Sequence, residues 1–402
     1  MTNPDVHTRT AWRAAVILLL ATTVSATAQP TRVVRADGKP AWGASARLAL
    51  EFTIGQVDGP PEVAFGSVIR AAADAGGGFY LFDQKDTQIR RYDARGAFVS
   101  SIGRKGAGPG EYQSVTAMEV TTEGLLFVYD PASRRITYFQ PDGKVRRDVS
   151  LARGFDWRGA TIDTAGRIYV TARLPGPREG PGARYQFVRL SSAGAIIDSI
   201  AHPVHIGDVA KTFCLITADG RRCNFTSETL IAPYRLGGII TAESHRYRVN
   251  IHDGAGHSLI IERSHSPVRL RGDERREWLA WASYQRTQSR IPGASYDIPS
   301  QKPAVRDLLT DTDGRIWVGV YTNAEKRHEA PRAAGDRRPL LTWKERTTYD
   351  VFSSAGTYLG RLQLPPDAQI LTIRASRVFL RTKGEEDEDR VAVFRIVSGS
   401  RP

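Results

Sequence analysis

Arginine is the residue type whose spacing in this sequence most clearly suggests chemistry. Arg158 and Arg306 each stand five residues before an aspartate of a predicted turn, Asp163 or Asp311, so they occupy equivalent positions in two repeated segments. A guanidinium is a planar fork of donors that matches a carboxylate, phosphate or sulfate. The sequence therefore predicts an anion site in the middle of the fold. The candidate ligand-binding residues are Arg70, Arg158, Arg235, Arg306 and Asp307.

Two features of this set leave an alternative open. An arginine in a strand is often only an ion-pair partner, and Asp156 or Asp307 could serve Arg158 or Arg306 in that way. Arg70 is one residue out of register with the other two when counted back from its turn. Because side chains alternate along a strand, Arg70 would point to the opposite face unless a β-bulge intervenes.

Metal chemistry is the second class of function to weigh. A His-x-x-His pair occurs at His202 and His205, but no carboxylate stands at a fixed spacing to complete a ligand set. Glu119, Asp156 and Asp307 are the acidic residues of the predicted inner strands. We therefore expect no cofactor. Calcium would suit these carboxylates, although they do not make a full set.

Short strands separated by turn residues recur along the chain and must position these side chains. The clearest copy reads VTAMEV, LLFVYD, RITYFQ and KVRRDVSL, with TTEG and PDG at its turns. Six such units follow one another with a period of about 45 residues, as in propeller blades. The sixth unit has only three strands, and the strand Arg47–Gly55 precedes the first unit. We predict an all-β, six-bladed β-propeller of four-stranded blades, closed when this N-terminal strand joins the last blade.

The second unit resembles the NHL-like repeat, and the chain over 47–397 resembles the bacterial exported six-bladed β-propeller family. The residues that carry the resemblance are Gly106-x-Gly-Pro-Gly-Glu-Tyr112, Arg135-Ile136 leading to Phe139, and Asp142-Gly143. The resemblance implies the fold but no single activity. Some six-bladed propellers are calcium-dependent lactonases or amidating lyases, so a metal-dependent hydrolase or lyase with its site on the propeller axis is the alternative function.

The N-terminus carries the pattern of a secretory signal peptide over residues 1–28. Arg9 and Arg13 precede the apolar run 14–24, and Ala26-Thr27-Ala28 predicts cleavage after Ala28. A retained anchor helix is the alternative, although the run is shorter than the roughly 18 residues that a span needs. We expect a periplasmic or secreted protein without a transmembrane segment in its mature chain.

The remaining chain divides into a polar leader and a propeller with two insertions. Residues 29–46 are rich in Gly, Pro and polar residues and predict a flexible leader. The propeller, 47–397, is interrupted by a helical insertion at 273–289 and a charged loop at 323–345. Its long connections all fall on one face of the predicted disc, and inserted loops on a rigid scaffold commonly carry binding sites.

The two cysteines, Cys214 and Cys223, flank a predicted hairpin. In an exported chain such a pair predicts a disulfide, and two reduced thiols are the alternative.

The net charge of +13 favours an anionic partner, such as an acidic protein or a glycan. Export argues against nucleic acid, and we expect a monomer. The sequence favours binding over catalysis, which predicts a binding or scaffold module of the cell envelope that holds its ligand on the long-loop face.

Overall fold

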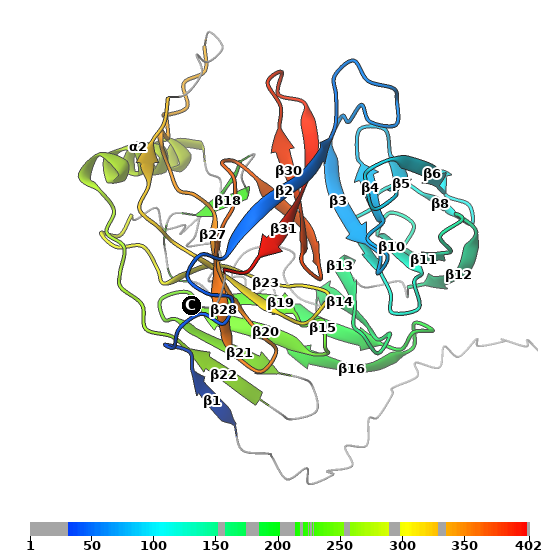
Figure 1. Cartoon of the computed structure of the whole chain (residues 1–402), viewed down its shortest axis with the longest axis horizontal. Helices are drawn as coiled ribbons and strands as arrows, with labels where there is room; N and C mark the ends of the chain where they lie inside the picture. Colours follow the sequence, from blue (N-terminus) through cyan, green and yellow to red (C-terminus); the bar gives the residue numbers. More distant parts are fainter. Residues whose placement is uncertain are drawn as a thin grey trace, which may run out of the picture.

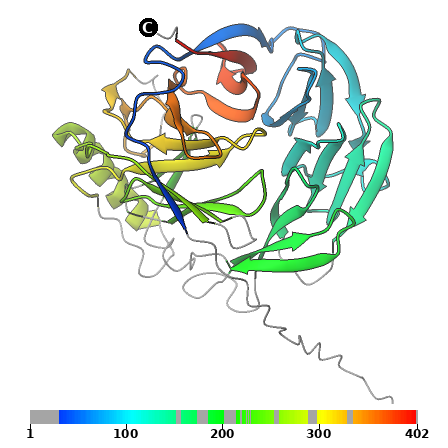
Figure 2. The same ribbon diagram turned by 60° about the horizontal axis from the view of Figure 1, so that its bottom comes forward.

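Six of the sheets in the described part of the chain have four or five strands, and they are arranged as blades around a central axis (Figure 2). The computed structural model describes residues 31–151, 157–173, 185–201, 214–217, 220–223, 225, 227, 229–252, 258–288, 298–328 and 335–399. In each blade the first strand lies innermost, next to the inner strands of neighbouring blades, as in the contacts of β3 with β9 and β29. The predicted all-β, six-bladed propeller is confirmed.

The first three blades are plain antiparallel meanders. Blade one consists of β3 (Val68–Ala73), β4 (Phe79–Asp83), β5 (Gln88–Tyr92) and β6 (Phe98–Ile102). Blade two consists of β9 (Ala117–Val120), β10 (Leu126–Asp130), β11 (Arg135–Phe139) and β12 (Val145–Ser150). Blade three consists of β13 (Trp157–Ile162), β14 (Ile168–Arg173), β15 (Tyr185–Leu190) and β16 (Ile196–Ala201).

The last three blades carry the additions to this plan. Blade four consists of β19 (Thr229–Pro233), β20 (Ile239–Glu243), β21 (Arg248–His252) and β22 (Ser258–Glu262). Blade five consists of β23 (Val305–Thr310), β24 (Ile316–Val320), β27 (Thr348–Phe352) and β28 (Tyr358–Gln363). Blade six consists of β29 (Gln369–Arg374), β30 (Arg377–Lys383), β31 (Asp389–Val397) and, outermost, β2 (Arg47–Ile54).

The ring closes where β2 meets β31. The two strands pair antiparallel from Arg47 opposite Val397 to Ile54 opposite Val391. Figure 1 shows β2, in blue, beside β31, in red. This pairing covers an edge that blade six would otherwise leave open, and it joins the two ends of the ring. The closure predicted from the incomplete sixth unit is confirmed.

The segment before β2 differs from the prediction of a flexible leader over 29–46. Residues Arg32–Arg35 form β1, which pairs in parallel with β22 and adds a fifth strand to blade four. Further on, the Ala41 and Trp42 amides donate to the carbonyls of Tyr358 and Leu359 in β28, at 3.1 and 2.7 Å. The leader prediction is wrong here, because the outer edges of blades four and five offer free backbone groups to a passing chain. We call residues 32–46 the N-terminal strap.

Apolar clusters between neighbouring blades form the core. Between blades six and one, the Phe79 ring lies 5.1 Å from Phe379 and 5.2 Å from Tyr92, centroid to centroid. The two faces of each blade pack against the two neighbouring blades. Strands in the middle of a blade, such as β4 and β10, are therefore buried throughout. Such contacts fix the relative position of the inner strands.

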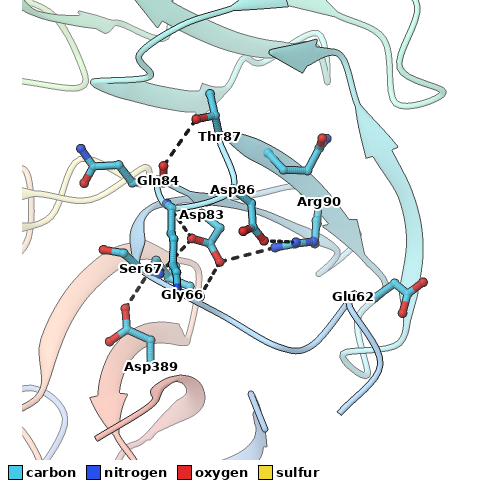
Figure 3. A network of polar contacts seen from close by, with 12 residues as sticks. Glu62, Gly66, Ser67, Asp83, Gln84, Asp86, Thr87, Arg90 and Asp389 are labelled. Atoms are coloured by element: carbon cyan, nitrogen blue, oxygen red, sulfur yellow. Dashed lines mark hydrogen bonds and ion pairs between the residues drawn. The ribbon is translucent and has the colours of Figure 1, made fainter. Parts of the chain in front are cut away.

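A buried carboxylate network fixes the start of β3 (Figure 3). Asp83 accepts hydrogen bonds from the Gly66 and Ser67 amides at 2.7 and 2.9 Å. Asp389 of blade six accepts one from the Val68 amide at 2.8 Å. Asp83 therefore ties the start of β3 to its own blade, and Asp389 ties it to blade six. These contacts lie just before Arg70 in the chain.

Residues 272–288, together with the chain around Leu341 and Thr342, form what we call the cap, on the face where the long connections lie. The helix α2 (Gly272–Gln288) packs Trp278, Trp281 and Ala282 into a small apolar cluster with Leu341. Glu277 accepts hydrogen bonds at 2.6 Å from the amide and hydroxyl of Thr342.

The second insertion also contains strands. The charged segment 323–345, predicted as a loop, includes the antiparallel pair β25 (Glu325–Lys326) and β26 (Trp343–Lys344). Two further pairs are β7 (Arg104–Lys105) with β8 (Glu111–Tyr112), and β17 (Cys214–Thr217) with β18 (Gly220–Cys223). No helix in the described part of the chain is long and apolar enough to span a membrane.

Candidate functional site

Two adjoining cavities lie along the propeller axis. The upper cavity, of about 340 Å³, lies at the starts of inner strands β3, β23 and β29, and Tyr321 and Thr347 complete its wall. The lower cavity, of about 330 Å³, lies toward the ends of the inner strands, with Met118, Thr310 and Thr372 in its wall. Arg70 lines both. Because inner strands start on the long-connection side, the upper cavity opens on the face that carries the cap.

Bulges in the inner strands bring Arg70 and Arg306 into the same cavity. In β3 the register with β4 shifts between Val68 and Arg70, and in β23 the register with β24 shifts between Val305 and Asp307. A bulge adds one residue to a strand and re-aims the side chains beside it. The two arginines therefore both line the upper cavity despite their different sequence registers.

Arg70 is held by carbonyl groups and not by a carboxylate. Its Nε donates to the Thr116 carbonyl at 2.6 Å and its Nη1 to the Ile69 carbonyl at 2.7 Å. Burial, and then the neighbouring Arg381 guanidinium, lower the pKa of Arg70, but an arginine remains protonated in proteins. Arg381 donates to the Val68 carbonyl at 3.2 Å and to the Gln369 side chain. The two cations thus create a local excess of positive charge at this wall.

Arg306 and Asp307 form the opposite wall. Arg306 Nη2 donates to the Thr347 hydroxyl at 3.0 Å. Asp307 accepts hydrogen bonds from the Tyr349 hydroxyl at 2.9 Å and from the Leu308 amide at 2.8 Å. Burial, with Asp307 close by, raises the pKa of Tyr349, so this hydroxyl keeps its proton and occupies the Asp307 oxygen. No ion pair between described residues uses Arg70, Arg306 or Arg381.

Arg235 has a different place from the one expected. It lies in the turn after β19, which ends at Pro233, and not in the inner strand. Its guanidinium bonds to Glu119 of blade two and to the Ile162 carbonyl, and its Nη2 donates to the Val120 carbonyl at 3.0 Å. Thr161 also donates to Glu119. These contacts join blades two, three and four at the lower cavity.

Several predicted residues have side chains outside the described part. Arg158 lies in β13 at an irregularity of the register between Trp157 and Ala160, and nothing further is described of its side chain. Cys214 stands directly opposite Cys223 in the pair β17 and β18. Residues directly opposite have Cα atoms about 4.5–5.5 Å apart, within the range of a disulfide. Because the side chains of Cys214 and Cys223 lie outside the described part, the disulfide stays a prediction.

The acidic residues considered for a metal site are separated. Glu119 lines the lower cavity and Asp307 the upper one, and each is engaged by the partners given above. Asp156, His202 and His205 lie outside the described residues. Among the described residues, no three His, Cys, Asp or Glu side chains gather in a way that could hold a metal ion.

The cap reaches the wall of the upper cavity through a buried lysine. Lys302 Nζ lies 2.7 Å from Glu274 Oε1 of α2 and 2.9 Å from Glu345 Oε1, and it donates to the Thr322 carbonyl at 3.0 Å. Tyr321 packs against the cap cluster and also lines the upper cavity. The cap is thus fixed beside the cavity mouth.

The sequence did not point to Tyr321, Thr347, Gln369 or Arg381 as part of this wall. Tyr321, Thr347 and Gln369 line the upper cavity, and Arg381 contacts the wall from the second strand of blade six. A weak signal existed, because Gln369 starts an inner strand just as Val68 and Val305 do.

These sheets and this axial site define a six-bladed β-propeller with an arginine-lined channel mouth. Residues 65–199 match the model of the DUF5128 family, described as a 6-bladed beta-propeller, so this part of the chain carries that family's signature. The resemblance to six-bladed propellers inferred from the repeats is confirmed. No curated protein matches the chain.

The solved structures that this protein resembles share little sequence with it. An exported-protein candidate of Bacteroides fragilis is 13% identical, with a TM-score of 0.49 over 91% of this chain and 99% of that one. A DUF4221 member of Bacteroides vulgatus is 10% identical, with a TM-score of 0.46 over 88% and 99%. Virginiamycin B lyase of Staphylococcus aureus is 11% identical, with a TM-score of 0.40 over 87% and 99%. None of these likenesses bears on what the present protein does.

Proposed function

We propose that this protein is an exported binding module that holds a small anionic ligand in the upper cavity, at the long-loop mouth of the propeller. The observation that carries the proposal is the pair Arg70 and Arg306, which come from blades one and five and line one cavity without a carboxylate in an ion pair. Asp307 lines the same cavity and offsets one of the positive charges, so Arg70 and Arg306, with Arg381 beside Arg70, leave an excess of positive charge that suits an external anion.

The cavity also limits the ligand. Its volume of about 340 Å³ lies at the lower end of the range for small-molecule sites, about 300–1,000 Å³. Leu230, Ile370 and Leu371 supply apolar wall beside the arginines, Thr347 and Gln369. A carboxylate with a short apolar body, free or as the acidic end of a glycan or protein partner, fits this mixture.

The test compares hexanoate with hexan-1-ol by isothermal titration calorimetry. The two probes differ in charge, so a site built around arginines should bind hexanoate more tightly. Arg70→Gln combined with Arg306→Gln should weaken hexanoate binding by at least about tenfold, because each substitution removes a charged donor. Arg374→Gln is the matched control, since Arg374 lies on the inner strand β29, donates to the Ala73 carbonyl and lines neither cavity. Equal binding of the acid and the alcohol would refute the proposal.

The cellular location is part of the same proposal and is tested separately. Cleavage after Ala28 would release a mature chain into the periplasm or the medium. Cell fractionation with N-terminal sequencing of the product should give Gln29 as the first residue; a cytoplasmic protein with an intact N-terminus would contradict it.

A further inference from the structure

Besides the two axial cavities, a groove lies on the outside of the ring, where the N-terminal strap crosses blade four. It has a volume of about 310 Å³ and shares no lining residue with either axial cavity. The strap supplies Arg35 and Asp37, β21 and the turn before it supply Arg246 and Arg248, and the end of β22 supplies Glu262 and Arg263. Figure 1 shows β1 at the free side of β22. We call it the rim groove.

The groove contains more positive than negative charge. Four arginines, Arg35, Arg246, Arg248 and Arg263, face two acidic residues, Asp37 and Glu262, which leaves an excess of two positive charges. Arg35 and Arg248 flank Glu262 in one row across three strands, since Glu262 pairs with both.

The two acidic residues are already engaged. Asp37 Oδ1 accepts the Ser264 amide at 2.6 Å, and Glu262 lies 3.5 Å from Arg248. The Ser264 hydrogen bonds lower the pKa of Asp37, with a smaller effect from Arg263 and Arg35, so Asp37 is ionised and already counted.

Among the described residues, Arg35 and Arg246 have no ion-pair partner, whereas Arg263 is already engaged. Arg263 stacks 3.7 Å over the Tyr358 ring, bonds to the Ala36 carbonyl and lies 3.8 Å from the buried Asp350. In contrast, no ion pair between described residues uses Arg35 or Arg246. Both are exposed residues that line the same groove, which the buried Tyr247 also lines. Two forked donors and two excess charges match one doubly charged oxyanion.

We propose that the rim groove binds a phosphate group and that it is complete only when the N-terminal strap is docked on blade four. Arg35 and Asp37 reach the groove because β1 pairs with β22. A ligand that contacts Arg35 from the strap and Arg246 from the blade therefore stabilises the docked strap by mass action. This inference is independent of the axial site and its ligand.

The test uses inorganic phosphate as the probe, with sodium chloride at equal ionic strength as the reference. Calorimetry should give one phosphate per chain, and Arg35→Gln or Arg246→Gln should each weaken it by about tenfold or more. Arg32→Gln is the matched control: Arg32 lies on the same strand, is exposed, and does not line the groove. Phosphate should also slow amide exchange in β1 of the wild type, but not in Arg246→Gln, whose strap is unaltered.

Two results would overturn the proposal: no phosphate binding beyond the effect of chloride, or equal weakening by Arg32→Gln. A further arm identifies the source of the phosphate group. Phosphatidylcholine vesicles with and without phosphatidic acid are mixed with the wild type and with Arg35→Gln. Binding to the anionic vesicles that Arg35→Gln and free phosphate both abolish assigns a lipid headgroup, whereas retained phosphate binding without vesicle binding assigns a soluble phosphate.

Discussion

Lys302 is the residue whose replacement should have the largest local effect. Its side chain is fully covered, and its ammonium lies between Glu274 of α2 and Glu345 of the segment before β27. Glu274 is 2% exposed. Lys302 is therefore the cation that balances the buried carboxylate of Glu274 and the partly buried one of Glu345 between the cap and the propeller.

The variant Lys302→Met keeps most of the side-chain volume and removes the charge. Removing one partner of a buried ion pair costs about 3–5 kcal/mol, because the other partner is left buried and unpaired. Here two carboxylates lose their shared cation, so we expect a loss in that range for opening the cap.

The loss should depend on pH with a definite sign. Burial raises the pKa of Glu274 even though Lys302 opposes it, so the folded protein takes up a proton more readily than the unfolded one. Stability from this group therefore rises as pH falls from above the folded-state pKa toward the ordinary range of a glutamate. Without Lys302 the folded-state pKa of Glu274 should rise further. The loss of stability in Lys302→Met should therefore become smaller as the pH falls.

The assay follows hydrogen exchange in α2 together with denaturant unfolding, so that opening of the cap is measured separately from unfolding of the ring. Lys144→Met is the control: Lys144 is exposed and pairs with Asp142 on the surface, and its replacement should leave exchange and unfolding unchanged. Adding Glu274→Gln to Lys302→Met should restore part of the protection of α2. The reasoning is refuted if Lys302→Met behaves like Lys144→Met near neutral pH, or if its deficit grows on acidification.

Three further predictions concern the frame around the site. Asp350→Asn should destabilise the protein by about 2–3 kcal/mol in denaturant unfolding, because the buried Asp350 carboxylate takes hydrogen bonds from Arg361 Nε and Nη2 at 2.8 and 2.9 Å; an unchanged midpoint would contradict this. Deleting residues 29–46 should lower Tm by a few degrees, because β22 and β28 lose their backbone partners and the apolar cluster around Leu362 loses Trp42. A calorimetric scan with no shift in Tm would show that the strap is dispensable. Intact-mass analysis before and after reduction should show the two-proton difference of a disulfide between Cys214 and Cys223, and an unchanged mass would show two thiols.

The blades could be predicted from the sequence because their signals are local. Turns such as the one ending in Gly143 need a positive φ, here 85°, and the flanking residues alternate or cluster with the period of a strand. The closing strand Arg47–Ile54 could be predicted as well, because a sixth unit with three strands requires a fourth from elsewhere. These inferences need only counting along the chain.

The candidate site could be predicted only in part. Arg306 and Asp307 were found by counting back from a turn, and both line the upper cavity. Counting left the face of Arg70 open, because a bulge such as the one in β3 changes the register by one residue without a sequence signature of its own. Arg235 was predicted as a ligand-binding residue of an inner strand, but it lies in the turn after β19, and its partners Glu119 and Ile162 belong to two other blades, which no count along the chain can show.

The repeated unit, the number of blades and the way the ring closes all follow from the amino-acid sequence. The pairing of charges became visible only in the folded chain: Arg70 lies beside Arg381, Lys302 beside Glu274, and Arg35 and Arg246 line one rim groove. The physical reason is that turns and strand periods depend on neighbouring residues, whereas a buried charge or a cavity depends on residues brought together from separate blades.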